Sequence, residues 1–205
     1  MRLETIENIP PVKCKSVMDK INYFFDWMEV VPKYKNIFVI ANSSKVRSEH
    51  IVTGSQDLLI VFNYFNHEIV AQHTGDTVVI RRQFSAQPLF HGHHSPLNRE
   101  EGRLRYFALS DYYDFVNVDN VKFLDPFDAV FCTDFIPYVS GDKMASSGYT
   151  LLYILNHYLQ LPIAGPDVHM MGFEFAGLSM HDWEYEKQQA KRFIFSKKRI
   201  EEEKE

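Results

Sequence analysis

Apolar residues along this chain alternate between short runs, typical of buried strands, and longer stripes with helical spacing. Residues 14–30 show such a helical stripe, and Pro32 ends it. The expected apolar positions of this first helix are Val17, Ile21, Phe24 and Phe25. The alternation predicts an α/β protein with one Rossmann-like domain, in which helices flank a mostly parallel sheet.

Runs of β-branched and aromatic residues predict the strands. NIFVIANSS from Asn36, DLLIVFNYF from Asp57 and DTVVIRRQF from Asp76 are the clearest, and DVHMMGFEF from Asp167 predicts a late strand. LRYFALS and AVFCTDFI are further candidates, whose positions in the sheet the pattern does not give. The segment from Ser85 to Arg103, rich in Gly, Pro and His, is predicted to be a loop.

Two helices are predicted in the C-terminal third of the chain. Ser146 and Ser147 can cap the first of them, and Asp182 lies near the start of the second. The first has an apolar stripe at Leu151, Ile154, Leu155, Tyr158 and Leu159. The second would dock through Trp183, Ala190 and Ile194.

Charge and composition narrow the function classes. The 22 Lys and Arg residues against 27 Asp and Glu leave a net charge of −5, so a broad nucleic-acid-binding surface is not expected. Cys14 and Cys132 are the only cysteines, and they suggest no disulfide framework. The N-terminus lacks the pattern of a signal peptide, and no run reaches the roughly 18 apolar residues of a membrane span, so we expect a cytoplasmic protein.

Polar residues follow the predicted strands at the points where a ligand crevice forms in open α/β sheets. Asn42 and Ser43 follow the first strand, Ser146-Ser147-Gly148 precedes a helix, and His181 follows the last strand. We expect these turns to converge. The Ser-Ser-Gly amides would either bind a phosphate at the helix N-terminus or serve only as a cap.

Two side chains, His181 and Asn63, allow both a functional and a structural interpretation. His181 is either a general base or a loop residue packed on Trp183, and Glu186, near the exposed start of the last helix, can fix its tautomer or raise its basicity. Asn63 interrupts an apolar run, so its amide either bonds to nearby backbone or points at a ligand.

Metal chemistry has little support in the sequence. His91, His93 and His94 could hold zinc, but no second ligand motif accompanies them, and an incidental loop is the favoured interpretation. No Asp-x-Asp occurs anywhere, so a glycosyltransferase that holds Mg²⁺ or Mn²⁺ on such a motif is disfavoured.

Together these segments resemble the sialylmotifs of family 29 glycosyltransferases and, more distantly, the bacterial family 42 enzymes. FVIANSS, DLLIVFN and GDTVVIRR are similar to the large sialylmotif, and residues 146–173 are similar to the small one. His181 and Glu186 match the His-x4-Glu of the very small motif. The resemblance covers roughly residues 36–83 and 144–190 and implies a GT-A-like domain without Asp-x-Asp, with no metal or other cofactor. We expect this single domain to span residues 1–205.

The family pattern also implies roles for single residues. Asn42, Ser43 and Asn63 would contact the cytidine monophosphate of a CMP-sugar, and His181 would deprotonate the acceptor hydroxyl. The Ser146, Ser147 and Gly148 turn would cradle ribose or phosphate. The chain departs from the pattern at Ala41 for Gly, Val61 for Arg and Ser147 for Thr, and it lacks the family's phosphate-binding tyrosine motifs and its bridging cysteines.

The expected function is that of a metal-independent inverting bacterial enzyme of polysaccharide biosynthesis. It would transfer sialic acid or a related keto-sugar from a CMP-sugar to a glycan or glycolipid of the cell surface. The alternative is a non-catalytic nucleotide-binding module in polysaccharide assembly. The apolar residues Phe193, Ile194 and Phe195 beside the basic residues 197–199 would give at most weak peripheral contact with the inner membrane. A docked helix with a solvated basic end is the simpler interpretation.

Overall fold

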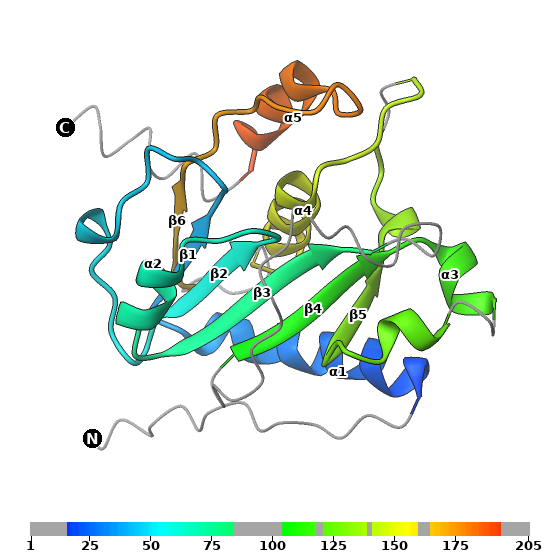
Figure 1. The fold of residues 1–205 in the computed structure, drawn as a ribbon, viewed down its shortest axis with the longest axis horizontal. Coiled ribbons are helices and arrows are strands. Elements are labelled where there is room, and N and C mark those ends of the chain that lie inside the picture. The colour runs from blue at the N-terminus through cyan, green and yellow to red at the C-terminus, as the bar shows by residue number, and fades with distance from the viewer. Residues whose placement is uncertain (1–15, 84–103, 118–120, 139–140, 160–164, 194–205) are drawn as a thin grey trace.

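The computed structural model describes residues 16–83, 104–117, 121–138, 141–159 and 165–193 (Figure 1). The predicted loop from Ser85 to Arg103, with His91, His93 and His94, lies outside these residues, as do Cys14 and Ile194. Within the described part, no helix combines the length and the apolar character needed to cross a membrane.

Six strands form one sheet in which every pair of neighbours is parallel. In spatial order they are β5 (Ala129–Cys132), β4 (Leu104–Ser110), β3 (Asp76–Arg82), β2 (Leu58–Phe62), β1 (Asn36–Ile40) and β6 (Asp167–Met171). The predicted α/β class is confirmed, and both of the weaker strand candidates belong to the sheet. Near-continuous burial of β2 and β3 explains their uninterrupted apolar sequences.

The strand order places a topological switch point between β1 and β6. The chain adds β2 to β5 on one side of β1, and then returns to pair β6 with its other edge. At such a point the connections after neighbouring strands diverge and leave a crevice at the carboxyl ends of the strands. The segments that follow β1, β2 and β6 meet there with the start of helix α4 (Ser147–Leu159) (Figure 1).

Helices α1 (Val17–Val30) and α4 pack on one face of the sheet. Phe24 of α1 contacts Phe131 with ring centroids 4.8 Å apart, and Trp27 meets Phe107 edge-on at 4.8 Å. The apolar face predicted for α1 was partly wrong, because Phe25 is exposed. The buried positions of α1 are Lys20, Tyr23, Phe24, Trp27 and Met28.

The other face of the sheet is covered by the short helix α2 (His67–Gln72) and by the segment around Leu124 and Phe127. Helix α3 (Tyr112–Val116) follows β4, and α5 (Trp183–Ala190) follows β6. In α4, Leu151, Ile154 and Leu155 are buried as the apolar stripe predicted. Phe193 is also buried and lies 6.0 Å from Tyr149 between ring centroids, so it packs in the core and does not face a membrane.

Candidate functional site

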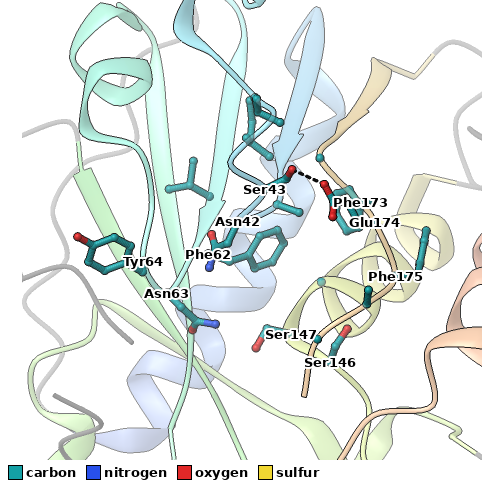
Figure 2. A pocket seen from close by; sticks show the side chains of 18 of the residues that line it. Asn42, Ser43, Phe62, Asn63, Tyr64, Ser146, Ser147, Phe173, Glu174 and Phe175 are labelled. Atoms are coloured by element: carbon teal, nitrogen blue, oxygen red, sulfur yellow. Dashed lines mark hydrogen bonds between the residues drawn. The ribbon is translucent and has the colours of Figure 1, made fainter. Parts of the chain in front are cut away.

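A cleft of about 790 Å³ opens at the switch point, a size within the range of small-molecule sites. Its walls come from the segments after β1, β2 and β6, from the start of α4, and from residues at the start of α5 (Figure 2). The residues predicted to bind the nucleotide or to act in catalysis all line it: Asn42, Ser43, Asn63, Ser146, Ser147, Gly148, His181 and Glu186. The predicted convergence of separate turns is therefore a feature of the structure.

The start of α4 presents backbone amides of its first turn to the cleft. The Ser146 hydroxyl accepts a hydrogen bond from the Tyr149 amide at 3.1 Å, so Ser146 caps the helix as predicted. Ser147 and Gly148 are the first two helical residues, and amides at these positions have no partner within a helix. Because the positive end of the helix dipole lies at the same place, an anion can bind there.

Gly148 also has a packing role. A Cβ atom at this position would lie 3.0 Å from Cε1 of Phe173, which follows β6. The absence of a side chain thus lets the Phe173 ring approach the first turn of α4. The close approach of an oxygen to Gly148, expected from the sequence, stays a prediction.

Glu186 is not at an exposed helix start, so that expectation was wrong. Its side chain has no exposed surface. It accepts hydrogen bonds from the Ser146 amide at 2.8 Å, from the Ser146 hydroxyl at 2.6 Å and from the Tyr138 hydroxyl at 3.3 Å. Glu186 therefore joins α5 to the N-terminus of α4 and positions the Ser-Ser-Gly turn.

Burial raises the pKa of the Glu186 carboxyl, while the hydrogen bonds from Ser146 and the nearby His181 act in the opposite direction. The pKa of Tyr138 is raised to about 12, chiefly by burial. Tyr138 therefore stays protonated near neutral pH and donates to Glu186, while its oxygen accepts from the Asp182 amide at 3.1 Å.

His181 is oriented by the backbone and not by a carboxylate. Its Nδ1 lies 2.8 Å from the Met144 carbonyl oxygen. A carbonyl oxygen only accepts, so Nδ1 carries a proton, and in the neutral imidazole Nε2 then holds a lone pair. Trp183 packs against the imidazole with ring centroids 4.9 Å apart. The ring is thus fixed in the tautomer that can take a proton at Nε2.

Asn63 follows β2 directly and does not interrupt the strand. Its backbone is left-handed, with φ of 42°, and its backbone N–H donates to the Ile80 carbonyl at 2.9 Å. The side-chain oxygen Oδ1 is buried and has no hydrogen-bond partner among the described residues. A buried amide without a partner is costly, so this oxygen favours the second of the two interpretations, a ligand contact.

Glu174, just beyond β6, is a charged cleft residue that the sequence analysis did not single out. The Ser43 hydroxyl donates to its Oε1 at 2.7 Å, and the Lys45 ammonium lies 3.1 Å from the same oxygen (Figure 2 shows the first contact). These two contacts hold the pKa of Glu174 below its usual value. The available signal was an acidic residue in the sequence Gly-Phe-Glu, three positions after the last residue of the strand. Asn42, beside Ser43, is exposed.

Comparisons of this chain with protein-family models, with curated proteins and with solved structures find no match. The resemblance to sialyltransferases thus stays a prediction based on the motifs. Among the residues that the structure covers, no group of three or more His, Cys, Asp or Glu side chains is placed to hold a metal ion.

The difference between this chain and the sialylmotif pattern at Val61 affects the charge of the cleft. Val61 is buried in the sheet and forms part of the cleft wall, where the family usually has an Arg. No Lys or Arg lines the cleft in the described part of the chain. The amides at the start of α4 are consequently the main groups there with positive character.

Proposed function

We propose that the protein is a metal-independent inverting glycosyltransferase. It would transfer sialic acid or a related keto-sugar from a CMP-sugar to a cell-surface glycan. The observation that carries the proposal is the presence, in one cleft, of an imidazole whose Nε2 has no hydrogen-bond partner among the described residues and of a helix N-terminus suited to phosphate. A general base and a site for an anionic leaving group are what a single displacement at an anomeric carbon requires.

In this mechanism the donor phosphate binds to the amides of Ser147 and Gly148. Asn63 Oδ1 accepts a hydrogen bond from the nucleoside. His181 Nε2 removes the proton of the acceptor hydroxyl as its oxygen forms a bond to the anomeric carbon. The bond from that carbon to the phosphate oxygen breaks through an oxocarbenium-like transition state, and its electron pair leaves with CMP. The helix N-terminus stabilises the charge that develops on the phosphate.

A non-catalytic nucleotide-binding module is the second candidate. The lack of a cationic side chain in the described cleft lining favours it, because departure of a phosphate needs electrostatic stabilisation. Binding without transfer needs less of that stabilisation than catalysis does.

Release of CMP from CMP-sialic acid, measured for the wild type and for His181→Ala in the presence of glycan acceptors, separates the two candidates. The transferase predicts turnover in the wild type and its loss in His181→Ala, with CMP still raising the melting temperature of both proteins. CMP binding without turnover in the wild type would leave only the module. No response to CMP in either assay would remove both candidates.

A further inference from the structure

Glu174 has chemistry that the mechanism above does not use. Both of its side-chain contacts among the described residues, from Ser43 and Lys45, are made to Oε1. Within the described part of the chain, Oε2 has no hydrogen bond or ion pair, and the side chain is 46% exposed. Because Glu174 also lines the cleft, one carboxylate oxygen is available to a ligand (Figure 2).

The backbone around Glu174 is held in an unusual shape. Gly172 has φ of 73°, and a Cβ atom there would lie 2.7 Å from Cγ2 of Val46 and 3.0 Å from Cβ of Ser43. Phe175, on the other side, has φ of 48°, a conformation that costs a non-glycine residue about 1–2 kcal/mol. Such conformations persist where packing enforces them, and they concentrate at functional sites. The segment is thus fixed against the loop after β1, with the carboxylate at the cleft.

A simple link between the two loops would account for only part of this arrangement. The contacts with Ser43 and Lys45 use one oxygen, and a Gln could accept from Ser43 equally well. These two contacts do not require an ionised carboxylate with its second oxygen, Oε2, open to the cleft. That oxygen suits a ligand that brings hydrogen-bond donors to this end of the cleft, while its anionic group binds at the start of α4.

An ionised carboxylate accepts hydrogen bonds and donates none. In a nucleotide the matching donors are the amino group of cytosine and the hydroxyls of ribose. Uracil presents an acceptor oxygen in place of that amino group, and a carboxylate repels it. We propose that Glu174 is a specificity residue that accepts hydrogen bonds from the nucleoside of the bound nucleotide. This inference rests on the proposed function, since it assumes a nucleotide in the cleft.

The test compares, for each protein variant, the ratios of the dissociation constants of different nucleotides. Dissociation constants for CMP, UMP and 2′-deoxy-CMP are measured by calorimetry with the wild type, Glu174→Gln and Glu49→Gln. Gln keeps an acceptor for Ser43 and removes the charge. Glu49 is an exposed glutamate outside the cleft, paired with Arg47 at 3.7 Å, and serves as the matched control. All three nucleotides carry one phosphate, so any general effect of Lys45 on anions cancels in the ratios.

We expect the wild type and Glu49→Gln to prefer CMP over one of the other two nucleotides by about 10-fold or more, the usual scale of a hydrogen bond to a charged group. Glu174→Gln should reduce that preference to less than about 3-fold. Loss of the preference over UMP would assign the contact to the cytosine amino group, and loss of the preference over 2′-deoxy-CMP would assign it to ribose.

Two results would overturn the inference while the proposed function stands. One is CMP binding with ratios that Glu174→Gln leaves unchanged. The other is a wild type that binds all three nucleotides equally well. A wild type that binds none of them would instead refute the proposed function, and the role of Glu174 with it.

Discussion

Replacement of Glu186 by Ala should destabilise the protein far more than replacement of any exposed glutamate. The substitution leaves two donors of Ser146, its amide and its hydroxyl, without the carboxylate that accepts from them at 2.8 Å and 2.6 Å. A buried donor without a partner costs about 1–3 kcal/mol. The expected loss in the free energy of unfolding is therefore about 2–5 kcal/mol, a large share of the stability of an ordinary domain.

Urea denaturation measures this loss, and Glu184→Ala is the matched control. Glu184 lies on the same helix two residues earlier and is exposed, and within the described part of the chain its side chain accepts only from Gln188, at 3.1 Å. Its substitution should change the free energy of unfolding by less than about 0.5 kcal/mol. Equal effects of the two substitutions would refute the structural role given to Glu186.

The pH dependence of the same measurement gives an independent check. Because burial raises the pKa of Glu186 in the folded state, the folded protein holds this proton at pH values where the unfolded chain has lost it. The contribution of Glu186 to stability is thus largest below its unfolded pKa and falls as pH rises from there through the folded pKa. The side chain in Glu186→Gln cannot titrate. As pH rises from the unfolded pKa through the folded pKa of Glu186, the wild type should therefore lose free energy of unfolding relative to this variant. A difference that is constant with pH would contradict the raised pKa.

Three further predictions concern the cleft. Ser147→Pro removes one backbone amide donor at the first position of α4, where proline is compatible with a helix, so it should cause little loss of stability. In a calorimetric titration it should weaken CMP binding by about 10-fold or more. The control Ser147→Ala keeps the amide and should bind CMP as the wild type does. Asn63→Gly keeps the left-handed backbone at φ of 42° but loses the buried Oδ1, so thermal unfolding should show near-normal stability and a reduced shift with CMP. Gly172→Ala should lower the free energy of unfolding, measured in urea, by at least about 1–2 kcal/mol, because φ is 73° and the new Cβ would lie 2.7 Å from Val46. An unchanged free energy of unfolding would show that the loops after β1 and β6 are not packed as described.

The sequence was informative wherever burial produces a long or regular pattern. The strands appeared as apolar runs, most clearly β2 and β3, which are covered on both faces and therefore have few polar positions. The edge strand β6 is exposed or only partly buried along its length and does not follow this rule. Helices α1, α4 and α5 were long enough to show a stripe or a cap. Helices α2 and α3 were missed, since six and five residues are too few for a helical period. The order of β4 and β5 depends on packing between distant segments, which no local pattern encodes.

In the cleft, the positions of polar residues were predictable but their partners were not. Residues directly after a parallel strand lie at one edge of the sheet, so Asn42 and Ser43 could be placed at the cleft from the sequence. His181 lies ten residues after the end of β6, so its place in the cleft depends on the path of the intervening segment. Glu186 was misjudged because an acidic residue in a first helical turn is usually exposed. Its position four residues before the buried Ala190 places both on one helix face, and this spacing was the available signal.

A crystal structure of the protein with CMP tests the central claim most directly. The account predicts that CMP lies in the cleft at the switch point between β1 and β6, with a phosphate oxygen within hydrogen-bond distance of the Ser147 or Gly148 amide and with His181 Nε2 facing the side where the sugar would be attached. CMP bound elsewhere, or in the cleft with its phosphate remote from the start of α4, would contradict it.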